Sequence, residues 1–114
     1  EDTKEDADYI LEKTINLRIF EDNEGKMNRS FLDINGEMMV VSQFTLLGDC
    51  VKGRRPSFIR AEEPRKANEL YEYFTQEARK NIKHVACGKF QEMMHIELVN
   101  NGPVTILLDS RKIF

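Results

Sequence analysis

Two kinds of hydrophobic pattern alternate along this chain, and their order narrows the choice of fold. Residues 3–18 and 64–81 carry apolar side chains at helical spacing, and Pro64 lies in the first turn of the second segment. Between and after them lie short apolar runs typical of strands, at residues 31–47, 90–99 and 104–109. We therefore predict one α+β domain over residues 1–114, with two main helices and a mostly antiparallel, barrel-like sheet.

The turn signals predict how the strands connect. Asn35-Gly36 is the strongest short hairpin signal, so we expect residues 31–34 to pair with a strand that starts at Met38 and runs to about Leu47. Gly25 marks an earlier turn, after a short extended stretch.

Charge and cysteine content exclude some classes of protein. A formal net charge of −3 argues against general coating of nucleic acid, although it permits a local basic patch. The apolar runs are far too short to span a bilayer, and the acidic start is unlike a secretory signal. Cys50 and Cys87 form neither a CxxC pair nor a metal-type spacing, so we expect reduced thiols in a cytosolic protein. The chain opens without Met on a helix cap, Thr3 with Asp6, and we interpret it as a fragment or a processed product.

The apolar run "MVVSQFTLLGD" contains polar residues where a buried strand should have none. A buried amide without a partner costs about 1–3 kcal/mol, so Ser42 and Gln43 need an explanation. Either their polar groups are satisfied inside the fold, which is the more common case, or the strand ends there and they line a site.

No standard catalytic or metal motif accompanies this run. His84 and His95 are the only histidines, and both are interpreted as surface residues, His95 on the polar face of a strand. No GxSxG elbow surrounds Ser42, so an esterase with a serine nucleophile is a minor alternative. No ligand cluster, P-loop or GxGxxG is present, and we expect no metal and no organic cofactor.

The long polar loop at residues 48–64 concentrates positive charge in an acidic chain. Four cations lie within nine residues, at Lys52, Arg54, Arg55 and Arg60. The loop is either a solvated surface segment or a segment that holds an RNA backbone, with Phe58 stacking on a base.

A second unusual turn is "NNGPVT". Pro103 cannot donate to a strand ladder, and Gly102 permits the close approach of a ligand or another backbone. Either this is a plain hairpin turn or the Gly-Pro bond is cis, and the sequence leaves the isomer open. Met93 and Met94 are interpreted as core residues in preference to a pocket wall.

"SQFTL" at residues 42–46 and "NGPVT" at residues 101–105 resemble the D-aminoacyl-tRNA deacylases, also called D-tyrosyl-tRNA deacylases. The linking segments "LEKTINLRIFEDNEGKMNRSFLD", "KGRRPSF" and "VTILLDS" are similar as well, so the resemblance covers essentially the whole chain. Members of that family begin with further strands, and the resemblance therefore implies a domain truncated at its N-terminus.

The resemblance implies a cytoplasmic homodimer that proofreads translation without a cofactor. Its reaction would be hydrolysis of the ester between a D-amino acid and the 3′ ribose of tRNA, and also of glycyl-tRNA mischarged on tRNA-Ala. Ser42 and Gln43 would hold the aminoacyl end, while the backbone N–H groups of Phe44 and Thr45 would stabilise the oxyanion. A 2′-OH of the RNA would help to activate water, with Thr45 as nucleophile the less favoured alternative.

The same resemblance implies that Gly102 and Pro103 form a cis chirality filter that reaches into the active site of the other subunit and rejects L-amino acids. Lys52, Arg54, Arg55 and Phe58 would be the candidate tRNA contacts. The alternative to the enzyme is an inactive fragment that retains an RNA-contacting or dimerisation surface.

Overall fold

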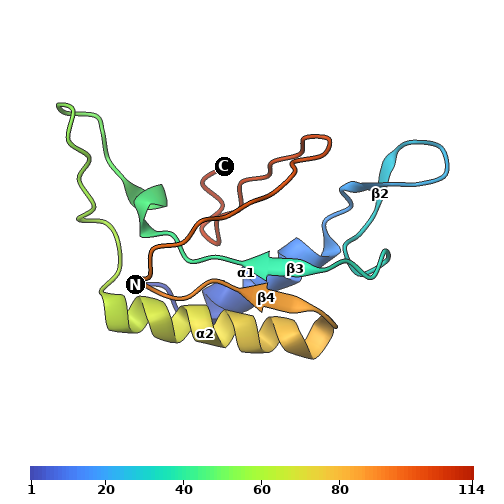
Figure 1. Cartoon of the computed structure of the whole chain (residues 1–114), viewed down its shortest axis with the longest axis horizontal. Helices are drawn as coiled ribbons and strands as arrows, with labels where there is room; N and C mark the ends of the chain where they lie inside the picture. The colour runs from blue at the N-terminus through green and yellow to red at the C-terminus, as the bar shows by residue number, and fades with distance from the viewer.

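The computed structural model describes residues 1–114 and contains two helices that pack against each other (Figure 1). Helix α1 spans Lys4–Asn16 and helix α2 spans Pro64–Asn81. The α+β class and the two main helices are confirmed, and α2 has the bounds that the sequence predicted. No helix is both long and apolar enough to cross a membrane.

Carboxylates cap the start of both helices. The Asp6 carboxylate accepts hydrogen bonds from the backbone N–H of Thr3 at 2.7 Å and from its hydroxyl at 3.0 Å. At α2 the Glu63 carboxylate accepts from the N–H groups of Arg65 and Lys66, at 2.9 and 3.2 Å. Each cap satisfies N–H groups that have no partner inside the helix, which fixes where the helix begins.

The core is small and lies between the two helices. Four buried apolar side chains form it, and half-buried ones cover them: Leu11, Ile15, Ala78 and Ile82, with Phe31, Met38, Phe74 and Val85. Ala78 is completely buried, and its methyl group lets the helices approach closely.

Two separate two-stranded sheets accompany the helices. Strand β1 (Phe20–Glu21) pairs antiparallel with β2 (Met27–Arg29), across a turn at Gly25. Strand β3 (Met38–Val40) pairs in parallel with β4 (Val85–Cys87), and α2 lies against β4. The sheets are thus shorter than the predicted apolar runs.

The predicted hairpin at Asn35-Gly36 is wrong. Residues 31–35 turn back on themselves, and the Gly36 N–H donates to the Phe31 carbonyl at 3.1 Å. Asn35 has a φ of 51°, the left-handed conformation that its residue type tolerates. Local turn bonds therefore replace the expected pairing of residues 31–34 with β3.

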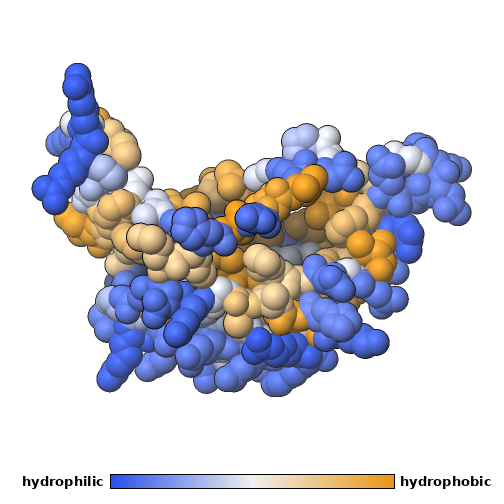
Figure 2. Space-filling view, viewed as in Figure 1, coloured by the Kyte–Doolittle hydropathy of each residue, from blue (hydrophilic) through white to orange (hydrophobic).

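The predicted strands at residues 90–99 and 104–109 are also wrong, because residues 92–109 contain no strand. We call residues 92–109 the open segment. Its backbone is without ladder partners, and apolar side chains along it are largely exposed, 72% for Leu98 and 92% for Val99. Figure 2 shows apolar surface around the hollow beside this segment.

The accessible surface confirms that much of the chain is uncovered. It is 9588 Å², whereas a globular protein of this mass would have about 6,500 Å². Large exposed apolar patches mark interaction surfaces, and the exposed side chains of the open segment are candidates for such a surface.

Candidate active site

The polar break in the apolar run marks the end of a strand. Strand β3 stops at Val40, and the chain then enters a 3-10 turn, η1 (Phe44–Leu47). Ser42 is half-buried, while Gln43 is exposed at the start of the turn. The structure confirms that the strand ends before Ser42 and Gln43. That these two residues line a site stays a prediction.

Free backbone donors lie at the start of η1. The N–H groups of Phe44 and Thr45 have no hydrogen-bond acceptor within the chain. The first N–H groups of a helical turn lack partners by geometry, and they suit a developing negative charge. The two adjacent donors therefore form a candidate oxyanion site.

Side chains at this turn supply no general base. The Thr45 hydroxyl accepts a hydrogen bond from the Gln43 amide at 2.5 Å, and no carboxylate, imidazole or amine hydrogen-bonds to it. An amide donor orients a hydroxyl but cannot take its proton. The arrangement favours chemistry that depends on backbone donors over activation of Thr45 as a nucleophile.

The loop after η1 rises from the body of the molecule as a long finger (Figure 1). We call residues 49–57 the basic arm. Backbone hydrogen bonds close its base, from Asp49 N–H to the Ser57 carbonyl at 2.8 Å and in the reverse direction at 2.9 Å.

The cations of this loop are exposed and without partners. None of the four forms an ion pair or a hydrogen bond within the chain: Lys52, Arg54, Arg55 and Arg60. The tip of the finger is hydrophilic in Figure 2. Cations left free in a chain of net charge −3 fit an external polyanion.

Phe58 does not stand free beside these cations. It is half-buried, and its ring packs edge-to-face on Phe44 with the ring centroids 5.0 Å apart. The base of the basic arm thus contacts η1 directly.

Gly102 and Pro103 lie at a bend of the open segment. The peptide bond between them is cis, and Gly102 has a φ of 134°. Ser42, Gln43, Phe44 and Thr45 therefore lie together around the start of η1, and Gly102 and Pro103 form no hydrogen bond with them.

Tyr71, on the apolar face of α2, joins the two parallel strands. The Tyr71 hydroxyl donates to the carbonyls of Gly88 and Val40, at 2.6 and 3.0 Å. Burial raises the pKa of this hydroxyl above its ordinary value. Both carbonyls lie at strand ends, so Tyr71 fixes the point where the chain leaves β3 toward Ser42. The hydroxyl on an otherwise apolar stripe is the only sequence signal of this role.

Other singled-out residues lie outside the site. His84 and His95 are exposed, in agreement with their surface interpretation, although His95 is not on a strand. Met93 is 92% exposed, so its core interpretation is wrong, whereas Met94 is half-buried beside Gly88.

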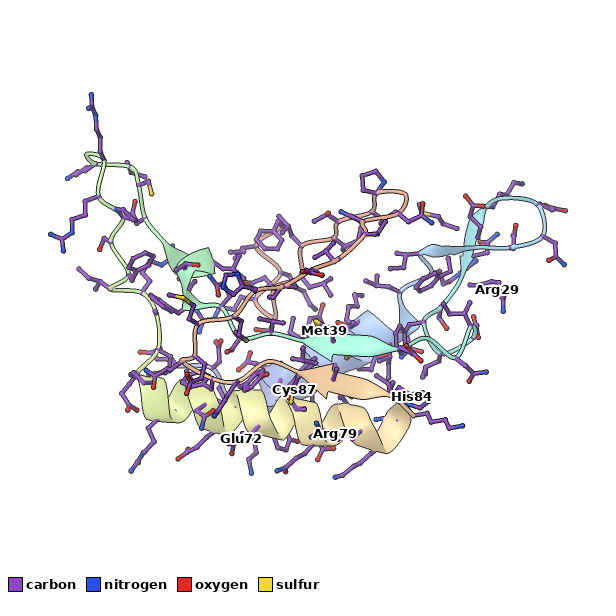
Figure 3. The ribbon with its side chains drawn as sticks, in the orientation of Figure 1. Arg29, Met39, Glu72, Arg79, His84 and Cys87 are labelled. Atoms are coloured by element: carbon purple, nitrogen blue, oxygen red, sulfur yellow. The ribbon has the colours of Figure 1, made fainter.

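The remaining polar features also lie away from Ser42. Figure 3 shows Arg79 of α2 beneath Cys87 of β4, with the guanidinium 3.5 Å from the thiol sulfur. Two shallow surface cavities of about 470 and 360 Å³ lie near Lys83 and His84. They flank the first residues of β3, the end opposite to the site, so cavity volume does not locate it.

The fold defines an α+β protein, and the two free donors at the start of η1 give it a candidate site for acyl-group chemistry. The profile of the family described as D-Tyr-tRNA(Tyr) deacylase matches residues 1–109. This chain belongs to that family.

Individual relatives agree with the assignment. A D-aminoacyl-tRNA deacylase of Syntrophus aciditrophicus is 65% identical over 109 residues, which cover 96% of this chain and 73% of that protein. A D-aminoacyl-tRNA deacylase of Caldicellulosiruptor bescii is 53% identical over 114 residues, which cover 100% of this chain and 76% of that protein. The solved structure of the c-Myc DNA Unwinding Element Binding Protein superimposes with a TM-score of 0.84 at 38% identity, and covers 93% of this chain and 72% of that one.

Proposed function

We propose that this chain is a D-aminoacyl-tRNA deacylase, an ester hydrolase that proofreads aminoacylated tRNA in the cytoplasm. Its membership of the D-Tyr-tRNA(Tyr) deacylase family supports the reaction class. The observation that carries the proposal is the pair of free backbone N–H groups at Phe44 and Thr45, at the start of η1. The whole of residues 1–114 acts as one deacylase domain.

The reaction is hydrolysis of the ester at the 3′ oxygen of the terminal ribose. Ser42 and Gln43 hold the aminoacyl group, and water attacks its carbonyl carbon. The negative charge that develops on the carbonyl oxygen is stabilised by the N–H groups of Phe44 and Thr45. The carbon–oxygen bond to the ribose then breaks and the 3′ oxygen takes a proton, which releases the D-amino acid and tRNA. The neighbouring 2′-OH assists the attacking water. Thr45 is not the nucleophile, because no side-chain base hydrogen-bonds to its hydroxyl.

Selection against L-amino acids comes from Gly102 and Pro103. We infer a homodimer in which Gly102 of the partner subunit lies near Thr45, since neither Gly102 nor Pro103 hydrogen-bonds to η1 of its own chain. The uncovered apolar surface supports the same assembly. Rejection by a closely placed backbone admits substrates with no L side chain, so glycine mischarged on tRNA-Ala is also a substrate.

The tRNA is held by the free cations Lys52, Arg54 and Arg55, with Phe58 at the base of the same segment. These side chains are exposed and unpaired, which favours contact with phosphates.

A second candidate is an inactive protein that keeps only an RNA-contacting or dimerisation surface. The large uncovered surface favours it, because a surface of this kind binds a partner whether or not the chain is active.

The test is hydrolysis of D-Tyr-tRNA and L-Tyr-tRNA by this chain and by Gly102→Ala. The φ of 134° at Gly102 is rarely adopted by L residues, and a Cβ there would lie 3.2 Å from the backbone N of Val104. We expect the wild type to cleave the D ester alone and the variant to be roughly 5- to 150-fold slower. Asn101→Ala, on the neighbouring exposed residue, is the control. Absence of cleavage by a folded wild-type chain would favour the inactive candidate, and equal cleavage of both esters would refute the filter.

A further inference from the structure

The aromatic pair of Phe44 and Phe58 joins the two parts of the proposed site. The ring centroids are 5.0 Å apart with an interplanar angle of 72°, the edge-to-face geometry that aromatic rings prefer. Phe44 is the first residue of η1, and its N–H is one of the two free donors. Phe58 directly follows the basic arm. A single contact therefore connects the donors with the segment that carries the free cations.

Gly48 makes room for this contact. A Cβ at Gly48 would lie 3.1 Å from Cε1 of Phe58 and 3.0 Å from the carbonyl oxygen of Thr45. The φ of Gly48 is −63°, which any L residue adopts, so a side chain here is disfavoured by the tight space and not by the backbone conformation. The ring of Phe58, the residue at position 48 and the backbone of η1 are thus packed together.

Little else holds η1 in place. Phe44 is 60% exposed, Leu46 is 84% exposed and Leu47 is 41% exposed, so the turn has few apolar contacts of its own. Oxyanion donors act only when they are fixed near their working geometry, since a displacement of about 1 Å costs orders of magnitude in rate. The ring that packs on the first residue of the turn is well placed to fix it.

We propose that Phe58 is a positioning residue that holds the backbone donors of η1 in a fixed position relative to the basic arm, and that it does not stack on an RNA base. The inference rests on the proposed function, because the donors matter only if the chain hydrolyses an ester. Phe58 acts through Phe44, and the Asp49–Ser57 bridge keeps the arm beside it.

The experiment compares Phe58→Ala, Phe58→Leu and Gly48→Ala with the wild-type chain. Two quantities are measured: the single-turnover rate of D-Tyr-tRNA hydrolysis at saturating enzyme, and the Kd for uncharged tRNA. Loss of an aromatic pair is expected to lower the rate roughly 3- to 10-fold in Phe58→Ala, with a smaller loss in Phe58→Leu and an unchanged Kd. Gly48→Ala displaces the same ring from the other side and should lower the rate without touching the RNA.

Ile59→Ala is the matched control, because Ile59 adjoins Phe58 and is 92% exposed, and this variant should match the wild type in both measurements. Should Phe58→Ala fail to fold by circular dichroism, Phe58→Leu and Gly48→Ala decide the question.

Base stacking predicts the opposite pattern. It would weaken tRNA binding roughly 5- to 150-fold in Phe58→Ala and leave the rate at saturation unchanged, which would overturn the proposal. Wild-type values for both quantities in Phe58→Ala would overturn it as well. Failure of the proposed function looks different, because the wild-type chain itself would then leave D-Tyr-tRNA intact.

Discussion

The helical pair and the open segment are both rich in apolar residues, yet only the first is packed. Helices α1 and α2 bury Leu11, Ile15 and Ala78 between them. The open segment exposes comparable side chains, with Leu98 at 72% and Val99 at 92%. The difference lies in where each segment finds its hydrogen-bond partners.

A helix satisfies its backbone within its own segment and needs one neighbour to cover its apolar stripe. Each helix here has that neighbour in the other, and caps at Asp6 and Glu63 complete its first turn. A strand needs a second strand before any of its backbone is satisfied. The open segment has the pattern of strands without a partner, so its apolar side chains stay uncovered.

The largest expected effect tests the packed half of this comparison. Leu11→Ala removes a side chain that is 5% exposed, and should lower the free energy of unfolding by about 2–5 kcal/mol. Leu98→Ala makes the same chemical change in the open segment and, at concentrations at which the chain is monomeric, should alter the free energy of unfolding by less than about 0.5 kcal/mol. Urea unfolding followed by circular dichroism measures both.

An equal loss in the two variants would break the comparison. It would mean that Leu98 is buried in solution, and sedimentation velocity at the same concentration would then show whether a second copy covers it. A small loss in Leu11→Ala would instead contradict the assignment of the core.

A smaller effect distinguishes the free cations of the basic arm from a paired cation of the helical pair. Arg54 and Arg55 are free on the basic arm, whereas Arg65 on α2 lies 3.7 Å from the Glu69 carboxylate. If the arm holds phosphates, Arg54→Gln and Arg55→Gln should each weaken tRNA binding and each reduce the slope of log K against log salt by about 1. Arg65→Gln is the matched control and should leave the slope unchanged. Binding to uncharged tRNA at several salt concentrations measures it, and equal slopes in all variants would show that the arm is only a solvated loop.

The same contrast explains which parts of the fold were predictable. The bounds of α2 follow from local signals, since Pro64 suits a first turn and the apolar stripe has the helical period. The strands were overpredicted because apolar alternation says nothing about whether a partner strand lies alongside. At Asn35-Gly36 the chain turns without forming the hairpin, because hydrogen bonds among residues 30–36 take the place of the expected ladder.

At the site, sequence and structure contributed different facts. The polar residues Ser42 and Gln43 marked the place where β3 ends, although the sequence allowed a buried alternative. The free N–H groups of Phe44 and Thr45 depend on the turn geometry, which no residue type encodes. The hydroxyl of Tyr71 and the ring contact of Phe58 depend on residues distant in sequence, and periodicity cannot report such pairs.

The smallest expected effect concerns the start of α2. It tests whether the cap that satisfies the first backbone N–H groups of this helix stabilises the fold. Hydrogen bonds from the backbone N–H groups of Arg65 and Lys66 hold the pKa of Glu63 below its ordinary value of 4.5. A lowered pKa in the folded state means that the charged cap stabilises the fold above about pH 4.5, and that this contribution is lost as the pH falls through the folded-state value. Glu63→Gln should therefore lower Tm slightly at pH 7, and its difference from the wild type should shrink on acidification. Thermal unfolding of both proteins between pH 7 and pH 3 measures this, and a gap that stays constant over that range would show that the charge on Glu63 does not stabilise the helix start.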